Sequence, residues 1–571
     1  MAEERRWVES DGLRLAVRVS GAPDGPTVLL VHGYPDNSSV WDGVAEALAG
    51  RFRVVRYDVR GHGESDAPAD RGGYRIEHLA ADLVAVIGAT SPAAPVHLVA
   101  HDWGSIQAWA VVGEPAHAGL FASFTSISGP GLGHLEGWLR AGLRDPRRAR
   151  AVLRQLRHSW YMAAFQVPLL PELFWLLPPA RARFHAAYRD ARNGVRLYRA
   201  NMLSRAGRPA PSVTRVPVQQ VALTQDRYCL PDVLRSAEPW CERLWRRELA
   251  AEHWAVRNRP GDVARFVTDF VDHVEGRPAA RELARARVGA AGGQMAGRLV
   301  LITGAGSGIG RATALTFASA GADVLCVDID LERAENTAGE VAARGSAGLA
   351  YRLDVGDEAA TRALAEAVVA EHGVPDVVMA NAGIGVSGPF LATSTQDWRR
   401  VLEVNLWGVV NTLRCFVPAM VDRGEGGHVV ITASMAGYFA TPNLPAYSTT
   451  KAGVLMLAQC LDGELRPAGI GVSAICPGVV HTDITNTARF AGRSAEEERV
   501  LRERATASYR LRGYGPDRVG AAVLRAVLDR KLVVPVTPEA RLAAMSSRIS
   551  PRFTRAAGRW IDRQATRVTQ G

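Results

Sequence analysis

The chain has 571 residues and a mass of 61.4 kDa, which is too long for one compact core and predicts two domains. Its 47% hydrophobic and 22% charged residues exclude a largely disordered chain. The net charge of +10 comes almost wholly from arginine, since the sequence holds only two lysines, Lys451 and Lys531. No nucleic-acid-reading motif accompanies this charge, so we interpret it as a compositional bias and expect no nucleic-acid partner.

Cysteine usage and the N-terminus favour a cytoplasmic protein. The six cysteines are scattered, without a Cys-x-x-Cys pair or metal-ligand spacing, which is typical of reduced thiols. The opening MAEERRWVES lacks the apolar core of a signal peptide, and no apolar run reaches the ~18 residues of a spanning helix. We expect a cytoplasmic location and no metal centre.

Short apolar runs in the first half each end on a polar motif. The runs at 28–32, 51–58 and 96–100 lead into His32-Gly33-Tyr34-Pro35, the stretch 60–65 and the stretch 101–105. Short strands separated by helical patterns predict a parallel sheet with helices on its faces. Active sites in such sheets lie at the carboxyl ends of the strands, where these motifs fall.

The stretch Ala100-His101-Asp102-Trp103-Gly104-Ser105 matches a nucleophile elbow, the strained strand-to-helix turn of α/β-hydrolases, with aspartate in place of serine. A carboxylate nucleophile forms an ester with its substrate, which an activated water then hydrolyses. The alternative is that Asp102 only caps the helix that follows. We favour the nucleophile, because its partners follow in the expected chain order.

Those partners are Asp226, which closes the apolar run at 218–226, and His253. The order nucleophile, acid, histidine is that of α/β-hydrolases. Asp226 would orient the imidazole, and His253 would take a proton from the water that attacks the ester. The remaining candidates are interpreted as structural histidines: His32, His62, His101 and His273.

With these motifs the first half resembles an epoxide hydrolase. The resemblance implies that the backbone N–H groups of Tyr34 and Trp103 form an oxyanion site. It also implies a helical cap at about 130–211, in which two segments around Tyr161 and Tyr198 resemble those that supply ring-opening tyrosines. A phenol can hydrogen-bond or protonate the epoxide oxygen as the ring opens.

One residue departs from this family. Glu252 precedes His253 where glycine is usual, which puts the hydrolase activity in question. A silent binding or assembly module is therefore one alternative for the first half. A haloalkane dehalogenase is another, since that family shares the aspartate and the following tryptophan, although Tyr34 stands where it often has a halide-binding asparagine.

A segment rich in arginine, alanine and glycine joins the halves. We predict an α/β-hydrolase domain at 1–276, a linker at 277–295 that is helical in part, and a second domain at 296–571.

The stretch from Arg298 to Asp328 carries the clearest signal of the second half. An apolar run breaks into Gly304, Gly306, Gly308 and Gly310, becomes an alanine-rich helical pattern, and returns to an apolar run that ends on Asp328. Strand, glycine turn, helix and strand in this order predict a dinucleotide site, with pyrophosphate at the helix N-terminus and ribose on the carboxylate.

The glycine turn and the motifs after it resemble the short-chain dehydrogenases, which implies a Rossmann-type doubly wound parallel sheet. The resemblance places the following residues at the cofactor: Gly304, Ser307, Gly308, Ile309, Gly310, Asp328, Asp354, Val355, Asn381, Ala382, Gly383, Tyr447, Lys451, Pro477, Gly478 and Thr482. Because Asp328 would repel a 2′-phosphate, and Ser307 and Ile329 offer no cation, we predict NAD in preference to NADP.

Tyr447 and Lys451 are four residues apart and so share one helix face. An ammonium beside a phenol favours the phenolate, which lets Tyr447 exchange a proton with an alcohol or carbonyl oxygen near neutral pH. The resemblance implies that Ser434 holds the reacting oxygen and that Asn405 anchors a water of the proton relay. The second half is thus predicted to be an oxidoreductase.

The C-terminal segments suggest a lid and a surface helix. The polar stretch 483–499 is interpreted as a mobile lid over the substrate. The tail at 540–567 spaces arginines among apolar residues, which indicates a surface helix, with peripheral contact to an anionic membrane as the second interpretation. We expect an apolar or lipid-like small-molecule substrate and leave a homo-oligomer open.

Taken together, the sequence predicts an epoxide-hydrolase-like domain fused to a short-chain dehydrogenase, a design similar to that of actinobacterial two-domain proteins. The order of the domains suggests that the first opens an epoxide to a vicinal diol and that the second oxidises a diol carbon. Substrate identity and the direction of hydride transfer stay open.

Overall fold

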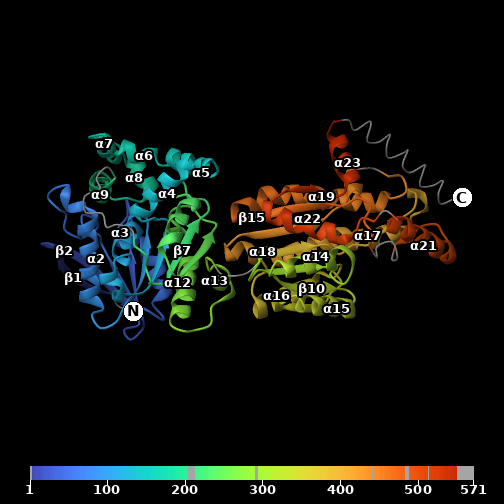
Figure 1. Ribbon diagram of the computed structural model, residues 1–571, viewed down its shortest axis with the longest axis horizontal. Coiled ribbons are helices and arrows are strands. Elements are labelled where there is room, and N and C mark those ends of the chain that lie inside the picture. Colours follow the sequence, from blue (N-terminus) through green and yellow to red (C-terminus); the bar gives the residue numbers. More distant parts are fainter. Residues whose placement is uncertain are drawn as a thin grey trace. The chain divides into compact units, whose positions relative to one another are not determined.

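A computed structural model describes residues 3–202, 212–289, 293–438, 441–482, 488–511 and 513–549. The chain divides into two compact units, Met1–Ala290 and Ala291–Gly571 (Figure 1). Each unit is an α/β structure built on one large sheet, so the predicted α/β fold class is confirmed for both.

The sheet of the first unit has eight strands in the order β1-β2-β4-β3-β5-β6-β7-β8. The strands β1 and β2 pair antiparallel with each other and β2 with β4, and all later pairs are parallel. The strand bounds are β1 (Glu4–Ser10), β2 (Leu13–Gly21), β3 (Thr27–Val31), β4 (Arg53–Tyr57), β5 (Val96–His101), β6 (Phe121–Ile127), β7 (Val218–Leu223) and β8 (Leu244–Leu249). The three strands predicted at the start of the chain correspond to β3, β4 and β5.

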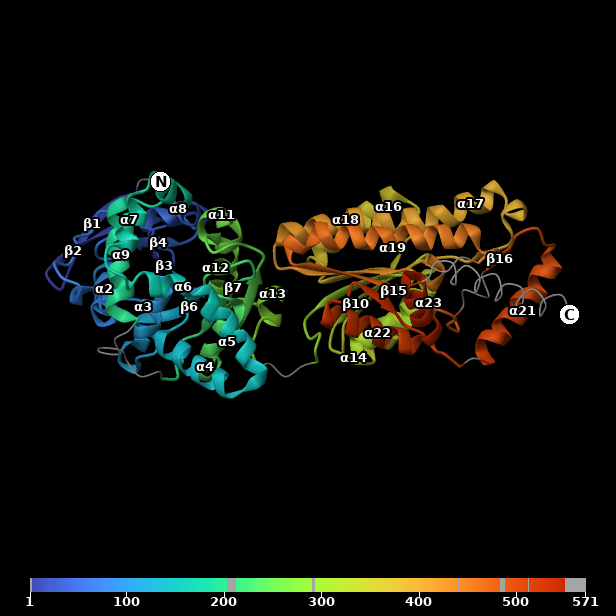
Figure 2. The same cartoon turned by 90° about the horizontal axis from the view of Figure 1, so that it is seen from above.

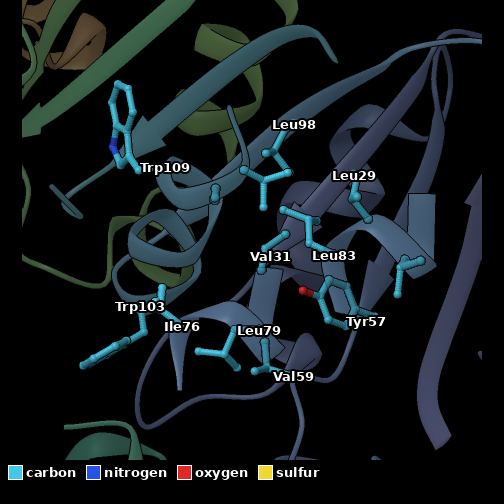
Figure 3. Close-up of a cluster of buried hydrophobic side chains, with 14 of the residues drawn as sticks. Leu29, Val31, Tyr57, Val59, Ile76, Leu79, Leu83, Leu98, Trp103 and Trp109 are labelled. Carbon is cyan, nitrogen blue, oxygen red and sulfur yellow. The ribbon is translucent and has the colours of Figure 1, made fainter. Parts of the chain in front are cut away.

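Helices cover both faces of this sheet, because alternate strand residues are apolar on each side. In β3, Leu29 and Val31 belong to one buried cluster, while Val28 and Leu30 belong to the other. Figure 3 shows part of the first cluster, where Leu83 of the helix α2 packs toward the sheet. The helices that flank the sheet are α1 (Asp42–Leu48), α2 (Ile76–Thr90), α3 (Trp103–Val112), α10 (Pro231–Leu234), α11 (Ala255–Asn258) and α12 (Pro260–Val274).

The cap is inserted between β6 and β7, where the sequence predicts it. It consists of α4 (Leu132–Arg144), α5 (Pro146–His158), α6 (Trp160–Ala164), α7 (Leu170–Leu176), α8 (Pro178–Phe184) and α9 (Tyr188–Asn201), which lie together beside one end of the sheet in Figure 1. Residues 203–211 of the predicted cap lie outside the described residues.

Most of the predicted linker is packed against the first unit. It contains the short helix α13 (Arg281–Arg285), whose Leu283 is fully buried with Trp245 and Phe270. Val288 N–H donates to the carbonyl of Leu244 at 2.8 Å, which adds the chain to the edge of the sheet. At the other end, Met295 N–H donates to the carbonyl of Ala320 in the second unit. The join between the described parts is therefore shorter than 277–295.

The second unit has a parallel sheet of seven strands in the order β11-β10-β9-β12-β14-β15-β17. The order reverses between β9 and β12, which creates the crevice of a doubly wound fold. The strands are β9 (Leu299–Thr303), β10 (Asp323–Asp328), β11 (Gly348–Arg352), β12 (Val377–Ala380), β14 (Gly427–Thr432), β15 (Ile470–Cys476) and β17 (Val533–Pro535), and β13 (Val386–Ser387) pairs separately with β16 (Arg489–Phe490).

Helices pack on both faces of this sheet (Figure 2). One face is covered by α14 (Gly308–Ser319), α15 (Leu331–Ala342) and α22 (Pro516–Asp529), and the other by α16 (Glu358–His372), α18 (Gly408–Arg423) and α19 (Pro445–Leu465). The remaining helices are α17 (Thr395–Leu402), α21 (Ala495–Leu511) and α23 (Pro538–Ile549). The predicted strand, turn, helix and strand from Arg298 to Asp328 are β9, α14 and β10.

The C-terminal predictions fall partly outside the described residues. Of the predicted lid at 483–499, residues 483–487 are not described, and the remainder holds β16 and the start of α21. Of the predicted tail at 540–567, the structure describes α23 as far as Ile549.

One helical stretch in the described part of the chain, Thr395–Arg423, is long and apolar enough to pass a composition test for a membrane span, with a mean hydropathy of 1.2. Buried core helices pass the same test. Half of its most apolar window is buried, and its α18 portion packs against β12 and α16.

Candidate active sites

Asp102 lies in a strained turn between β5 and α3, with φ +51° and ψ −121°. Small neighbours are required there: a Cβ added at Gly104 would collide with the carbonyl oxygens of Val31 and His32, and one at Gly129 with the carbonyl oxygen of Asp102. This close packing of backbone on backbone presents the Asp102 carboxylate at the end of the sheet. It is the geometry predicted for a nucleophile elbow.

His253 lies between the two carboxylates that the sequence assigns to it. Its Nδ1 is 2.8 Å from Asp226 Oδ2, and its Nε2 is 3.5 Å from Asp102 Oδ2. Asp226 is itself fixed, because its Oδ1 accepts from the backbone N–H groups of Tyr228 at 2.7 Å and Cys229 at 3.1 Å. Nucleophile, base and orienting acid are thus assembled from the ends of β5, β7 and β8.

The charges of this triad are coupled. Burial alone would raise the pKa of Asp102, but the hydrogen bond and charge of His253 hold that pKa below its usual value. Burial alone would lower the pKa of His253, but Asp226 and Asp102 together raise it to about 10. The site therefore holds two carboxylates and an imidazolium at neutral pH.

The predicted oxyanion donors lie beside the nucleophile. The backbone N–H of Tyr34 donates to Asp102 Oδ1 at 2.9 Å, and Trp103 follows Asp102 at the first position of α3. Close approach here depends on Gly33, since a Cβ at this position would lie 2.5 Å from Asp102 Oδ1 and 2.8 Å from the carbonyl oxygen of His101.

We expect Gly33→Ala to reduce turnover at Asp102 by at least about tenfold, because the added methyl group displaces the carboxylate from its donor by a distance that near-attack geometry does not tolerate. Turnover of an epoxide measures the loss. Gly261→Ala is the matched control, since a Cβ there meets nothing within 4 Å. Equal activity of the two variants would show that the turn tolerates a side chain.

Both predicted ring-opening tyrosines line the same cavity of about 910 Å³ as Asp102. Tyr161 of α6 and Tyr198 of α9 have ring centroids 6.0 Å apart, and both line the cavity with Asp102 and His253. Burial raises the pKa of both phenols well above the usual value, and the Asp102 carboxylate adds to the shift. They therefore stay protonated and can donate.

The other histidines assigned to structure make structural contacts. His32 Nε2 accepts from Val59 N–H at 2.9 Å, and His101 Nε2 lies 2.8 Å from the carbonyl oxygen of His253. His62 Nδ1 lies 3.2 Å from the carbonyl oxygen of Arg60, and the ring of His273 packs on Trp245.

Glu252, which departs from the epoxide hydrolase pattern, is exposed, whereas His253 beside it is 4% exposed. Its carboxylate is turned to solvent and does not compete for the triad.

In the second unit, the glycine turn between β9 and α14 is shaped for close approach. Gly304 and Gly308 have φ of +66° and +52°, and a Cβ added at Gly310 would collide with the carbonyl oxygen of Gly304. Ser307 is the N-cap residue of α14 in extended conformation, so the first N–H groups of the helix, including those of Gly308 and Ile309, point out of its N-terminus.

Asp328 lies at the end of β10 beside this turn. Its Oδ2 accepts from Gly306 N–H at 2.8 Å, and its Oδ1 accepts from Asp330 N–H at 3.1 Å. The structure also places Arg333 close to the glycine turn, a cation that the sequence did not indicate. A Cβ at Gly306 would lie 2.7 Å from Arg333 Cβ. The Arg333 guanidinium pairs with Asp330 at 3.2 Å.

The residues predicted at the third and fourth strand ends divide into two groups. Asp354 Oδ1 accepts from Gly356 N–H at 3.0 Å, and Val355 is buried against Gly408. At the end of β12, Ala382 N–H donates to Thr303 Oγ1 at 3.2 Å, and Gly383 lies close to Asn405 and Lys451.

Asn381 serves the framework. Its amide donates to the carbonyl oxygens of Thr303 and Gly304 and accepts from the hydroxyl of Thr432 at 3.0 Å. It ties the ends of β9, β12 and β14 together and holds the glycine turn. The sequence predicts its position but not that its side chain faces inward.

Lys451 is 3% exposed and lies beside Tyr447 on α19, with its Nζ 5.7 Å from the phenol ring centroid. Its ammonium donates to the carbonyl oxygen of Thr432 at 2.8 Å, and burial lowers its pKa to about 8. The predicted pair is thus on one helix face, beside the end of β14.

Asn405 lies close to this pair, in the π-helical turn η6 (Glu403–Trp407) that interrupts the helix between α17 and α18. Its side chain exchanges hydrogen bonds with the backbone of Ile384, accepting at 2.8 Å and donating at 2.9 Å. A Cβ at Gly383 would lie 3.2 Å from Asn405 Oδ1 and 3.5 Å from Lys451 Nζ, so the two side chains meet there. Such π turns often occur at functional sites.

Ser434 follows β14 and caps the short helix η7 (Met435–Gly437), where its Oγ accepts from Ala436 N–H at 3.1 Å. The next residue, Met435, donates its N–H to the carbonyl of Pro477 at 2.8 Å. This bond joins the Ser434 loop to the predicted Pro477-Gly478 motif.

Thr482 lies over the glycine turn, since a Cβ at Gly308 would be 3.2 Å from Thr482 Cβ. Gly478 has no room for a side chain, because a Cβ there would collide with Glu539 and Thr537. Of these predicted positions, Thr482 therefore borders the glycine turn, whereas Gly478 packs against Glu539 and Thr537.

Comparison with known proteins agrees with this division. The alpha/beta hydrolase fold model matches residues 26–260, and the short chain dehydrogenase model matches residues 298–491. The protein called probable oxidoreductase EphD from Mycobacterium bovis is 44% identical over 581 residues, which cover 97% of this chain and 98% of that protein. The chain belongs to the EphD family. EphD of Mycobacterium tuberculosis is similar to the same degree.

As a member of the EphD family, the chain joins an alpha/beta hydrolase domain to a short-chain dehydrogenase domain of the oxidoreductase class. The α/β-hydrolase fold of the first half and the short-chain dehydrogenase of the second half, both recognised from the sequence, are confirmed. Among solved structures, a short chain dehydrogenase from Burkholderia phymatum in complex with NAD is 30% identical, with 46% of this chain and 96% of that chain covered and a TM-score of 0.42.

The dehydrogenase domain of this EphD family member fits a dinucleotide. Its glycine turn leaves a cradle that a side chain at Gly306 would fill, since an added Cβ would lie 2.7 Å from Arg333 Cβ and 2.9 Å from Asp328 Oδ2. Backbone N–H groups and the Asp328 carboxylate border this cradle. These are the donors and acceptors that a pyrophosphate and a ribose require.

The structure adds hydrolase-site residues that the sequence analysis missed. Tyr228 lines the cavity, with its ring 5.0 Å from that of His253 and 5.5 Å from that of Tyr161. Trp254 lines it also, and its indole N–H donates to buried Asp36 at 2.9 Å. The sequence carried a signal for both. Tyr228 is two residues after Asp226, Trp254 directly follows His253, and Asp36 directly follows the His32-Gly33-Tyr34-Pro35 motif.

Proposed function

We propose that the chain is a bifunctional enzyme in which the hydrolase domain opens an epoxide to a vicinal diol and the dehydrogenase domain transfers a hydride between an alcohol or carbonyl substrate and NAD. One observation carries the first half of this proposal: Asp102 in its strained turn, the His253–Asp226 pair and two protonated phenols border one cavity. A carboxylate nucleophile and phenolic donors in one cavity suit a strained ether.

In the first step, an Asp102 carboxylate oxygen attacks a ring carbon and forms an ester as the carbon–oxygen bond of the epoxide breaks. Tyr161 or Tyr198 donates its proton to the departing oxygen. In the second step, His253 takes a proton from a water that attacks the ester carbonyl, and the N–H groups of Tyr34 and Trp103 stabilise the oxyanion. As the ester carbon–oxygen bond breaks, the departing oxygen takes the proton of the newly formed Asp102 carboxylic acid. The diol leaves, and His253 keeps the proton from water, as in the free enzyme.

The coupled charges give these steps their order. The pKa of His253 is raised to about 10 while Asp102 and Asp226 are both ionised, so the imidazole is protonated in the free enzyme. Ester formation neutralises Asp102 and removes one of the two charges that raise this pKa. The imidazolium can then pass its proton toward the phenolate left by ring opening, so that His253 becomes a base at the step that needs one.

In the dehydrogenase domain, Tyr447 would exchange a proton with the substrate oxygen, and buried Lys451 would favour its phenolate form. Ser434 would hold that oxygen. Asn405, fixed by the backbone of Ile384, would anchor a water of the relay beside Lys451. Bound NAD would accept or supply the hydride.

The test of the proposal is isotopic. In heavy-oxygen water the ester carbonyl of Asp102 is attacked by labelled hydroxide, so repeated turnover with an epoxide should leave label in the Asp102 carboxylate, seen by mass spectrometry of its peptide. Inclusion of NAD should then give NADH from the diol formed. Absence of label with the diol still produced would mean that water attacks the epoxide directly.

The preference for NAD over NADP is supported by Asp328 at the ribose end of the cradle. We expect Asp328→Ala to reduce the preference by at least about tenfold, because the carboxylate that would repel a 2′-phosphate is gone and Arg333 lies nearby. The ratio of kcat/KM for the two cofactors measures this. Asp323→Ala, at the other end of β10, is the control, and an unchanged ratio in the Asp328 variant would contradict the assignment.

Two other functions remain as outcomes of these experiments. A silent binding module would leave Asp102 unlabelled and hydrolyse nothing, although exposed Glu252 leaves the triad intact. A haloalkane dehalogenase would release halide from haloalkanes. The indole of Trp103, a donor for a halide, packs edge-on against the ring of Tyr198, with ring centroids 5.0 Å apart. We also propose a cytoplasmic location and an apolar or lipid-like substrate, the latter because aromatic side chains line much of the cavity.

A further inference from the structure

The outer face of the cap is unusually apolar. Of the thirteen large apolar side chains described as exposed in the first unit, ten lie between Leu153 and Leu177. They include Trp160 at 70%, Leu169 at 69% and Leu173 at 59% exposure. Single exposed apolar residues are normal on any protein, but a concentration on consecutive helices marks an interaction surface.

These helices lie on one side of the first unit, where α5 contacts α6 and α7 contacts α8. Figure 1 draws α5, α6, α7 and α8 along one side of the first unit, and Figure 2 looks onto that side from above. In α5, Val152 and Gln155 are buried, so Arg150, Leu153 and Arg154 point outward. We call the exposed surface of α5 to α8 the cap face.

The cavity opens through the cap face. Trp160, Leu170 and Phe174 are all more than 40% exposed, yet they also line the cavity that holds Asp102. The entrance of the hydrolase site is therefore framed by apolar side chains at the surface. Arg157 and Arg227, both exposed, stand at the same entrance.

The charge of the cap face is strongly basic. Residues 146–184 contain seven arginines against one acidic residue, Glu172. Glu172 is occupied, because it pairs with Arg199 at 2.6 Å. An isologous contact between two copies of this chain would place these arginines against each other, so charge complementarity selects a partner that is both apolar and anionic.

We propose that the cap face docks on the surface of an anionic lipid bilayer, with its leucine and tryptophan side chains among the acyl chains and its arginines at the phosphates. Long arginine side chains can lay their stems along an apolar surface while the guanidinium stays at the headgroups. An apolar substrate then passes from the bilayer into the cavity without crossing water. Docking does not require that Asp102 opens an epoxide, so either proposal can fail alone.

The test is co-sedimentation of the full chain with vesicles of phosphatidylcholine, with and without phosphatidylglycerol. We expect binding to the mixed vesicles, weaker binding to phosphatidylcholine alone, and release by salt. The double variant Leu153→Ser/Leu173→Ser should lower the partition coefficient at least about tenfold, because two leucines lose their burial. The variant Arg150→Gln/Arg154→Gln should lower the partition coefficient for the mixed vesicles only. The expected loss is about 1 kcal/mol, or fivefold, for each arginine.

None of these four residues lines the cavity, so the rate with a water-soluble epoxide and the thermal unfolding midpoint should stay unchanged. Leu542→Ser is the matched control: Leu542 is 62% exposed on α23, and its replacement should leave binding intact. Binding lowered by Leu542→Ser and not by the cap variants would assign the contact to the C-terminal region and overturn the proposal. So would a wild-type chain that ignores mixed vesicles, or one that self-associates through Leu153 and Leu173.

Discussion

Replacing Asp102 by alanine is expected to abolish epoxide hydrolysis, with a loss of at least about a thousandfold, because the carbon–oxygen bond that opens the ring has no other partner at this position. Oxidation of an added diol should be unchanged, since that reaction belongs to a separate unit. Production of NADH from the epoxide should therefore fall to background. The measurement is absorbance of NADH with epoxide or diol as substrate.

Glu252→Gln provides the control for this variant. Glu252 is adjacent to the catalytic histidine in sequence but exposed, so its charge should not matter. If Asp102→Ala still forms NADH from the epoxide at the wild-type rate, the two reactions are not coupled. If diol oxidation falls as well, the variant has damaged more than the nucleophile.

Replacing Tyr447 by phenylalanine is expected to lower the dehydrogenase rate by about a hundred- to ten-thousandfold, the range typical of a lost general acid or base. The ring and its contact with Lys451 remain, so cofactor affinity should be retained. Epoxide hydrolysis in the same preparation serves as the internal measure of folding. Stopped NADH formation with unchanged NADH binding, followed by fluorescence, would support the assigned role.

Tyr351→Phe is the matched control, because its phenol contacts His372 Nε2 at 2.6 Å away from the glycine turn. A loss of activity in this variant as large as in Tyr447→Phe would point to a general weakening of the domain. Full activity of Tyr447→Phe would remove Tyr447 from the proton transfer.

The residues that the sequence located well are those fixed by backbone position. Asp102 and Asp226 each follow a buried strand of the first sheet, so the ends of its parallel strands bring them to one edge. The glycine turn follows a buried strand of the second sheet in the same way. Apolar periodicity together with strained or glycine-rich turns was sufficient there. Tyr161 and Tyr198 on the cap depended on family resemblance, because their helices meet the sheet only through tertiary packing.

What the sequence did not provide was the direction of side chains and the contacts between distant segments. Asn381 ends a strand as predicted, but three strand ends meet around it and draw its amide inward. The π turn at Asn405 inserts one residue into a helix, and the spacing of apolar residues in the sequence does not reveal this insertion. The linker was predicted from its composition, yet Leu283 fills a gap beside Trp245 that only the folded first unit creates.

Because the sequence has only two lysines, lysine modification can be used to measure local opening of the dehydrogenase domain. Lys531 is 61% exposed, and an acylating reagent would modify it readily, whereas Lys451 is sealed under the end of a strand. Once exposed to solvent, a lysine amine reacts according to its neutral fraction. Acylation of Lys451 therefore reports each opening of the structure around it. Counting the modified lysines by intact-mass spectrometry would thus measure the rate of local opening of the dehydrogenase domain without any engineered residue.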